Sequence, residues 1–459
     1  MTRICRSAAQ LICFCCGVFS ASSASAQWTS VGTERFTTGR AWMTSMAIDI
    51  GGVPYVAYED SLNGFSATVM KYNGSAWVNV GNPSFSAGEA DFIRVAISNA
   101  EVPYVCYTDF GNGGKATVMK YDGSAWAPVG SVGFSDGEAH FTTIAIDEAG
   151  TPYLAYSDMS DSGKIHVVRF DGSNWIPVGG GGFSVGLAYR TAIALTSTGV
   201  PYVIYNDTGV NYSTVVKKFN GVDWETVGAA GFSGHGGDFV NIAIGNGDTL
   251  YTAYSDYDFG TGGVTVKKFN GTDWVTVGER SFSGRTAFWL SLAISDAADG
   301  RRPYVAYEDY FGGQKATVMR FDGSNWVDVG GGGFSTRSAA YVSMAIAPNG
   351  GIYVSYADRD SMASTGQVTV MKYNMVAGVK NIASSAANSI RIFPNPGNGA
   401  ISISAAYKIT SVVICNPLGK VVYSHECNAD DVQADVSSLP AGVYFVRLNG
   451  REAGRFVKE

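Results

Sequence analysis

Residues 134–179 read FSDGEAHFTTIAIDEAGTPYLAYSDMSDSGKIHVVRFDGSNWIPVG, and close copies of this stretch recur along the chain. One tryptophan marks the same place in each copy: Trp28, Trp77, Trp126, Trp175, Trp224, Trp274 and Trp326. Successive tryptophans are 49, 49, 49, 49, 50 and 52 residues apart. A fixed period of this size is typical of a repeat architecture, so the repeat decides the fold.

Each copy predicts four short β-strands. In the quoted copy the apolar runs are 141–146, 153–156, 165–170 and 175–178. They are rich in β-branched and aromatic residues and are bounded by turn residues. Asp171-Gly172 between the last two runs is a strong hairpin signal. Four antiparallel strands in a repeat of this length are typical of a β-propeller blade.

The two ends of the repeat predict how the ring closes. The last copy runs from Phe334 to Tyr373 and lacks its tryptophan strand, whereas the strand at Trp28 has no strands before it. The expected fold is therefore all-β, a seven-bladed propeller whose N-terminal strand completes blade seven. Without this pairing the ring would leave sheet edges open.

Two features recur in all seven copies. A small residue occupies one position of the first strand, where the blades crowd around the axis: Ala47, Ala96, Ala145, Ala194, Ala243, Ala293 and Ala345. The motif Tyr-x-x-Tyr-x-Asp ends the second strand, and its aspartates are expected to cap their own turns rather than bind calcium or another ligand: Asp60, Asp109, Asp158, Asp207, Asp256, Asp309 and Asp358.

The chain divides into four predicted parts. Residues 1–26 combine a basic start, the apolar run Leu11–Phe19 and the small residues Ala24-Ser25-Ala26, which predicts a secretory signal peptide. A lipoprotein signal at Cys16 is the alternative, disfavoured by the bulky residues before it. The propeller spans 27–374 and an Ala/Ser-rich linker spans 375–388. Residues 389–459 predict about seven short strands, a small Ig-like β-sandwich.

Charge and cysteine content narrow the classes of partner. The net charge is −7, and no basic block or stripe occurs, which argues against nucleic acid as a partner. No apolar run of the mature chain approaches the roughly 20 residues of a transmembrane span. Cys106 is expected to be buried and inert, and a disulfide between Cys415 and Cys427 is neither required nor excluded by the pattern.

The C-terminal part carries several motifs in order. They are Ile390 to Gly399, with Pro394, Asn395 and Pro396; Asn416 to Lys420, with Gly419; Asp435 to Leu448, with Gly442; and the basic end Arg455 to Glu459, with Lys458. This order resembles the C-terminal sorting domain of type IX secretion in Bacteroidetes. The resemblance implies export through the inner membrane, passage through the outer membrane by the type IX machinery, and removal of the domain in the linker. It further implies release from the cell or attachment to surface lipopolysaccharide.

The propeller carries a second, partial resemblance. Arg169 to Trp175 is similar to the Asp-box hairpin of sialidase-like propellers, although the usual serine before the aspartate is missing. In those proteins the hairpin is structural and lies far from the active site. The resemblance therefore implies the fold and not sialidase chemistry.

The candidate site lies on the axial face, where first strands begin. Unlike the aspartates, the residues at this position differ from blade to blade, as a binding site requires: Trp42, Asp91, His140, Tyr189, Asp238, Phe288 and Ala340. Trp42, Tyr189, Phe288 and Trp289 fit stacking on sugar rings, gripping a peptide or simply capping the pore. Arg40, Arg94, Arg190 and Arg285 also fall near the axis, but no blade pattern assigns them a role.

One cluster at this level offers chemistry. Glu89, Asp91, Glu138 and His140 come from neighbouring blades, and they fit a divalent cation such as calcium, an acid–base pair, or a solvated polar rim. The mature chain carries no His-Glu-x-x-His, Gly-x-Ser-x-Gly, Walker or Cys-x-x-Cys motif. The favoured hypothesis is a secreted or cell-surface protein, not an enzyme and without a cofactor, that binds an extracellular glycan or protein, as in adhesion. The alternative is a hydrolase or lyase acting on extracellular polysaccharide.

Overall fold

The computed structural model describes residues 27–374 and 391–459, except residues 235, 259, 296–300, 361–365, 417–419 and 450. The predicted signal peptide and linker therefore lie outside the described residues. The chain divides into two compact units, Met1–Val376 and Ala377–Glu459. Among the described residues, no helix is long and apolar enough to cross a membrane.

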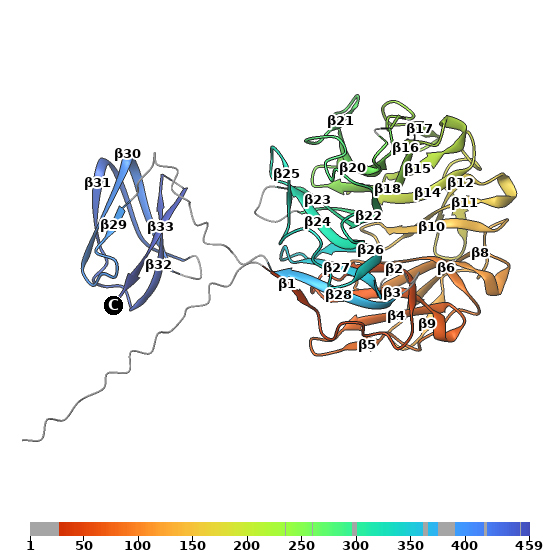
Figure 1. Cartoon of the computed structure of the whole chain (residues 1–459), viewed down its shortest axis with the longest axis horizontal. Coiled ribbons are helices and arrows are strands. Elements are labelled where there is room, and N and C mark those ends of the chain that lie inside the picture. The colour runs from red at the N-terminus through yellow and green to blue at the C-terminus, as the bar shows by residue number, and fades with distance from the viewer. Residues whose placement is uncertain are drawn as a thin grey trace, which may run out of the picture. The chain divides into compact units, whose positions relative to one another are not determined.

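Seven four-stranded antiparallel sheets form the first unit and surround a common axis (Figure 1). Blade 1 contains β2 (Ala41–Ile48), β3 (Pro54–Asp60), β4 (Ser66–Tyr72) and β5 (Trp77–Asn79). Blade 2 contains β6 (Ala90–Ile97), β7 (Pro103–Asp109), β8 (Lys115–Tyr121) and β9 (Trp126–Pro128). Blade 3 contains β10 (Ala139–Ile146), β11 (Pro152–Asp158), β12 (Lys164–Phe170) and β13 (Trp175–Pro177).

The other four blades repeat this order. Blade 4 contains β14 (Ala188–Leu195), β15 (Pro201–Asp207), β16 (Ser213–Phe219) and β17 (Trp224–Thr226). Blade 5 contains β18 (Gly237–Gly245), β19 (Thr249–Asp256), β20 (Gly263–Phe269) and β21 (Trp274–Thr276). Blade 6 contains β22 (Ala287–Ile294), β23 (Pro303–Asp309), β24 (Lys315–Phe321) and β25 (Trp326–Asp328). Blade 7 contains β26 (Ser338–Ile346), β27 (Ile352–Arg359), β28 (Gln367–Asn374) and β1 (Gln27–Ser30).

The first strand of the chain closes the ring, as predicted. β1 pairs antiparallel with β28, and Trp28 lies opposite Tyr373. Short 3₁₀ helices follow the second strands of blades 1–4: η1 (Ser61–Asn63), η2 (Phe110–Asn112), η3 (Met159–Asp161) and η4 (Thr208–Val210).

Each blade is joined to the previous blade by its tryptophan. The indole Nε1 donates a hydrogen bond to a valine carbonyl of the preceding blade, as from Trp28 to Val329 at 2.8 Å and from Trp77 to Val31 at 2.7 Å. The indole also stacks on a phenylalanine of the loop that enters its own blade, and Trp28 lies 3.9 Å from Phe334 between ring centroids. The tryptophans therefore fill the space between adjacent blades, as expected.

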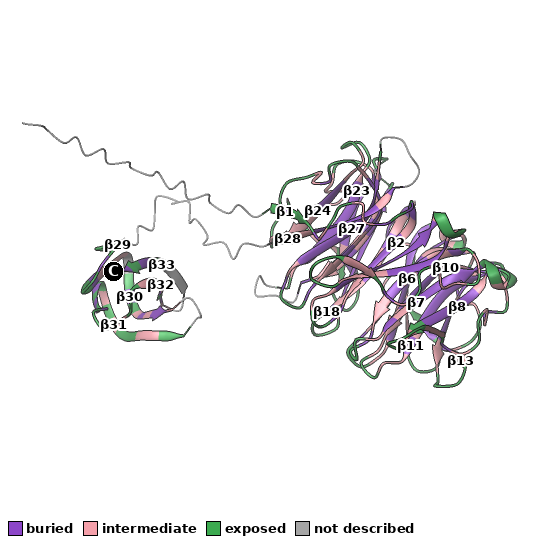
Figure 2. Cartoon of the chain, turned by 90° about the horizontal axis from the view of Figure 1, so that it is seen from below, coloured by how far each residue is buried: buried purple, intermediate pink, exposed green. Residues whose placement is uncertain are grey.

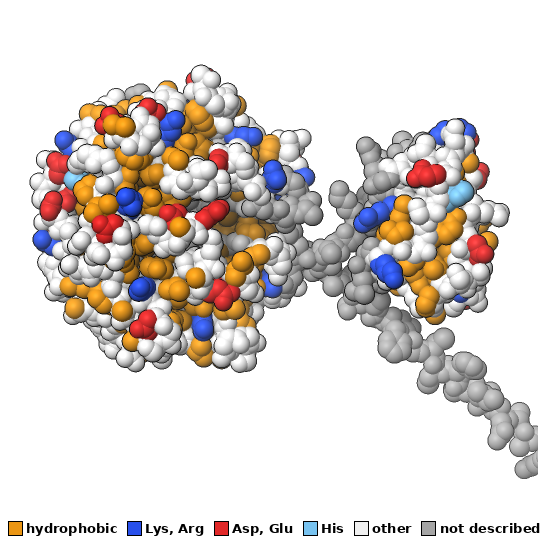
Figure 3. All heavy atoms as spheres, turned by 180° about the vertical axis from the view of Figure 1, so that it is seen from behind, with side chains coloured by type: hydrophobic (Ala, Val, Ile, Leu, Met, Phe, Trp, Pro, Cys, Tyr) orange, Lys and Arg blue, Asp and Glu red, His pale blue; other side chains and the backbone are white. Residues whose placement is uncertain are grey.

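The core of the propeller lies between the blades. Second strands pack against both neighbouring sheets, and all seven residues of β3 are buried. Figure 2 shows purple along second strands such as β7 and β27, with green at the loops. Figure 3 shows that acidic and basic side chains are interspersed over the visible face of the first unit. Cys106 is fully buried in this core, and its free thiol is inert to solvent as expected.

The second unit is a small sandwich-like domain with fewer and longer strands than predicted. It contains β29 (Arg391–Phe393), β30 (Ala400–Cys415), β31 (Val421–Asp435), β32 (Gly442–Leu448) and β33 (Arg451–Lys458). β30 and β31 each join two of the predicted strands, because register shifts along this pair keep both halves hydrogen-bonded. Cys415 and Cys427 are free thiols, so no disulfide links them.

Candidate functional site

The first strand of each blade, which we call the inner strand, contains a β-bulge close to its start. The sequence did not predict these bulges. The register shifts at the same place in all seven strands. One non-glycine residue per strand adopts a left-handed backbone there, which is uncommon and which re-aims side chains. We call these seven residues the bulge ring: Met43, Phe92, Phe141, Arg190, Phe239, Trp289 and Tyr341.

The residue before each bulge belongs to the predicted site. This set, which we call the rim, consists of Trp42, Asp91, His140, Tyr189, Asp238, Phe288 and Ala340. Rim residues pair with the residue before each invariant aspartate, as Trp42 does with Glu59 and Asp91 with Thr108. Ala340 is buried, whereas the other six rim residues are half-buried.

The rim and the bulge ring connect neighbouring blades around the axis. Ring centroids lie 6.5 Å apart for Phe141 and Tyr189, 5.4 Å for Phe239 and Phe288, and 6.2 Å for Tyr341 and Trp42.

The chain of contacts includes a cation. Trp289 lies 5.1 Å from Phe239 and 4.4 Å from Tyr341 between ring centroids. The Arg190 guanidinium lies 4.3 Å from the centroid of Phe239 and forms a 3.0 Å ion pair with Asp238. The structure thus links Trp42, Phe288 and Trp289 through the bulge-ring residues Phe239 and Tyr341, whereas Tyr189 contacts Phe141.

The acidic cluster is arranged differently from the expectation. His140 Nε2 lies 2.9 Å from Glu138 Oε1 within one blade, whereas Asp91 faces Glu59 and Glu89 is exposed. Within the described part of the chain, no three His, Cys, Asp or Glu side chains are grouped to hold a metal ion. Of the three interpretations left open for these four residues, a shared metal site therefore gains no support from their arrangement.

Two buried glutamates were missed by the sequence argument. Burial and the nearby Asp91 carboxylate raise the pKa of Glu59 to about 9. Burial raises the pKa of Glu308 to about 7, against the effect of Arg359, whose Nη2 lies 2.9 Å from Glu308 Oε1. Both occupy the variable position before the invariant aspartate, and that variability was the signal available in the sequence.

A cavity of about 250 Å³ lies on the axis. Its lining includes the whole bulge ring and residues of all seven inner strands that follow it, among them Arg94, Thr143 and Asn241. Of the four arginines considered from sequence, Arg94 and Arg190 line this cavity, whereas Arg285 donates to the Phe311 carbonyl at 3.3 Å.

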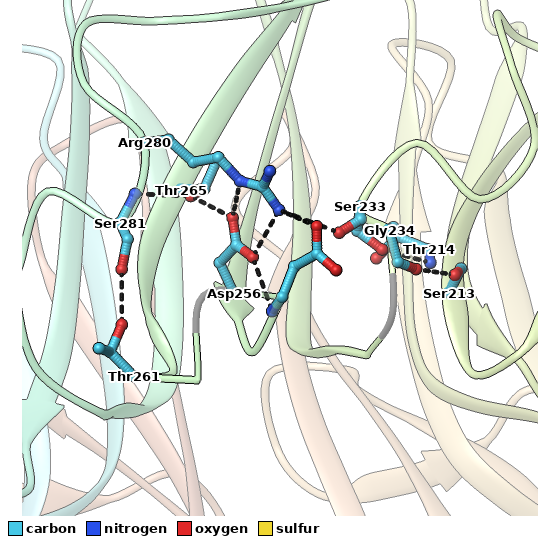
Figure 4. Close-up of polar contacts among 10 residues, drawn as sticks. Ser213, Thr214, Ser233, Gly234, Asp256, Thr261, Thr265, Arg280 and Ser281 are labelled. Atoms are coloured by element: carbon cyan, nitrogen blue, oxygen red, sulfur yellow. Dashed lines mark hydrogen bonds and ion pairs between the residues drawn. The ribbon is translucent and has the colours of Figure 1, made fainter.

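The invariant aspartates serve the scaffold. Asp60, Asp158, Asp207, Asp256 and Asp309 accept backbone N–H groups of their own turns. Asp109 accepts from the Asn112 and Thr117 side chains, each at 2.8 Å. Asp256 also holds Arg280, which enters from the loop before blade 6 and reaches the Ser233 carbonyl (Figure 4).

The sorting motif lies along one end of the second unit. Asn395 donates to the Arg455 carbonyl at 3.0 Å and accepts from the Val457 N–H at 2.9 Å. The Lys458 ammonium contacts Asn398, and Lys458 is only 5% exposed. Pro394, Pro396, Lys420 and Gly442 are described, whereas Gly419 lies outside the described residues.

The chain is thus a seven-bladed β-propeller with side chains at its axis that vary between blades, followed by a separate small β-domain. That domain is a secretion system C-terminal sorting domain, matched over residues 391–458. The sorting domain marks the chain for type IX secretion, to the medium or to the outer-membrane surface. No curated protein matches the chain.

Several solved structures are similar in shape. PorZ, a surface component of the type IX secretion system of Porphyromonas gingivalis, has a TM-score of 0.47 and 14% identity, over 91% of this chain and 59% of PorZ. The Aleuria aurantia lectin has a TM-score of 0.43 and 15% identity, over 69% of this chain and 98% of the lectin. The Trypanosoma rangeli sialidase has a TM-score of 0.44 and 11% identity, over 94% and 91%. At this similarity, they say nothing about the ligand of this chain.

Proposed function

We propose that the propeller is a surface or secreted glycan-binding protein whose ligand lies on the rim. The observation that carries this proposal is the group of half-buried aromatic side chains Trp42, Tyr189 and Phe288 on the rim, with Asp91, His140 and Asp238 between them. Aromatic faces suit the C–H faces of sugar rings, and a few polar groups among them fix orientation through hydroxyl groups. Because the seven blades contribute six different residue types to the rim, the site lacks sevenfold symmetry and suits an asymmetric ligand.

The test is a glycan panel with matched variants of the full chain. We expect the triple variant Trp42→Ala, Tyr189→Ala, Phe288→Ala to lose tenfold or more in affinity for any glycan that the wild type binds. Ile50→Ala is the control, because Ile50 is 69% exposed in the loop after β2, at the opposite end of the inner strand. Binding by the triple variant at wild-type affinity would contradict the proposal, and so would a wild type that binds a protein partner but no glycan.

A hydrolase or lyase acting on polysaccharide is the second candidate. The observation that favours it is the pair of contrasting groups near the rim: a Glu59 carboxyl that stays protonated at neutral pH and a His140–Glu138 couple. The double variant Glu138→Ala, His140→Ala separates the two candidates. Turnover of a polysaccharide by the wild type, abolished in the double variant, would establish the enzyme. Unchanged binding by the double variant without any turnover supports the binding protein.

A further inference from the structure

The axial cavity lies directly beneath the proposed glycan site. Its upper wall is the bulge ring, and its lower wall is formed by the residues two positions further along each inner strand: Ser45, Arg94, Thr143, Ala192, Asn241, Ser291 and Ser343. Six of these seven side chains are polar. A volume of about 250 Å³ exceeds what a single water molecule needs.

Arg94 is the charged member of this lower wall. Its Nη1 donates to the Ile93 carbonyl at 2.9 Å, which uses one of the five N–H donors of a guanidinium. Among the described residues, no carboxylate oxygen lies within 4.0 Å of its nitrogens. A cation that lines a cavity without an ion-paired carboxylate favours any anion that can reach it.

Arg190 enters the same cavity from blade 4. Asp238 holds its Nε at 3.0 Å, and the rings of Phe239 and Trp289 lie 4.3 and 5.6 Å from its guanidinium carbon, so these contacts fix its orientation. Burial and the charge of Arg190 lower the pKa of Arg94, whereas the Asp91 and Glu59 carboxyl groups act in the opposite direction, so Arg94 lies within electrostatic reach of Arg190 and of both carboxyl groups. Both remain charged at neutral pH, since an arginine begins far above it.

The nearby carboxyl groups are already engaged. Asp238 is paired with Arg190, and Asp91 Oδ1 accepts the Phe92 N–H at 2.7 Å while the carboxylate faces Glu59. The cavity therefore holds two cationic side chains, one without a close carboxylate, together with hydroxyl and amide groups from several blades.

We propose that this cavity is an anion subsite that takes the carboxylate or sulfate group of an acidic sugar, contacted by Arg94 and Arg190. This rests on the proposed function, because the rim presents the sugar to which the anionic group is attached. Guanidinium groups bind oxyanions through paired N–H donors, and the Thr143 hydroxyl and Asn241 amide add neutral donors. The ligand class is thereby narrowed from glycans in general to uronic or sulfated glycans.

Titration calorimetry of the full chain at low ionic strength tests the subsite, with sulfate, glucuronate and, as the neutral match, glucose as probes. We expect glucuronate to bind at least tenfold more tightly than glucose, and Arg94→Gln to remove this difference and the binding of sulfate. Arg169→Gln is the control, because Arg169 lies on β12 outside the cavity, and it should leave both unchanged. Equal affinity for glucuronate and glucose, or an Arg94→Gln variant that binds sulfate like wild type, would overturn the subsite.

A second variant guards against misfolding of Arg94→Gln. Ala192→Glu keeps both arginines and places a carboxylate in the cavity, so it should compete with sulfate and abolish its binding. The two proposals fail separately. If rim variants lose glycan binding but keep Arg94-dependent sulfate binding, the subsite is supported. If neutral and acidic glycans bind through the rim with equal affinity, the subsite is overturned and the proposed glycan site still holds.

Discussion

The tryptophans between the blades and the bulge ring at the axis are both sevenfold sets of side chains that bridge neighbouring sheets. Each tryptophan stacks on a phenylalanine in every blade, and the stacked ring centroids lie between 3.9 and 5.0 Å apart. At the axis the backbone geometry also repeats, but the side chains range from Met43 to Arg190. Repeated geometry with one side-chain type suits a scaffold, whereas the five residue types of the bulge ring on one repeated geometry suit recognition, as we propose.

The largest expected effect concerns the scaffold set at the ring closure. Trp28→Ala removes a 6% exposed indole, its stacking on Phe334 and its hydrogen bond to Val329. We expect a loss of about 3–5 kcal/mol in the free energy of unfolding, measured by denaturant titration with circular dichroism. Trp175→Ala is the matched control and should cost less, because Trp175 is less buried and its strand is joined to its neighbour by a hairpin. Equal losses would show that ring closure contributes nothing special.

The second prediction concerns the buried Glu59, which pairs across the sheet with the rim residue Trp42. The pKa of Glu59 is raised from 4.5 to about 9, so its stabilising contribution is complete below about pH 4.5 and is lost as the pH rises through about 9. Glu59→Gln keeps a donor toward Asp91 and removes this titration. Between pH 5 and 7 the wild type should lose on the order of 3 kcal/mol more unfolding free energy than the variant. Parallel pH profiles of the two proteins would contradict the burial of a protonated acid.

The contrast also explains what the sequence was able to predict. The period, Trp28 and the missing last strand were sufficient for seven blades and their closure, because each blade repeats the same local pattern and the ring leaves one arrangement. The rim was also predicted, because a fixed distance from a repeated phenylalanine locates equivalent positions in every blade.

The bulges and the buried glutamates escaped prediction for physical reasons. A bulge shifts the register by one residue without any glycine, so Phe92 or Arg190 shows no local sign of a left-handed backbone. The burial of Glu59 depends on the next blade, which supplies Asp91 and Arg94. Spacing along the chain shows which positions of the seven repeats are equivalent. It does not show which of these positions face each other across neighbouring blades.

The third prediction concerns the invariant aspartates, which cap turns of the scaffold and do not belong to the proposed binding site. Asp207 is 1% exposed and accepts the N–H groups of Gly209, Gly186 and Val185 at 2.9, 2.8 and 3.0 Å. Asp207→Ala leaves three part-buried backbone donors without their charged acceptor, and we expect a loss of about 2–3 kcal/mol by thermal and denaturant unfolding. Asp171→Ala, which removes a similar turn in an exposed hairpin, should cost clearly less. A comparable loss at both positions would argue that burial of the aspartate is unimportant.

The smallest effect on stability is expected at the rim, where the effect on binding should be large. Trp42 is half-buried, and its centroids lie 6.1 Å from Phe65 and 6.2 Å from Tyr341, beyond the stacking distances of Trp28. Trp42→Ala should therefore change the unfolding free energy by only about 1 kcal/mol. The same variant should weaken glycan binding severalfold, because the proposed site uses the half-buried Trp42 ring for contact with the sugar. A Trp42→Ala protein as destabilised as Trp28→Ala would place this tryptophan with the scaffold and remove it from the site.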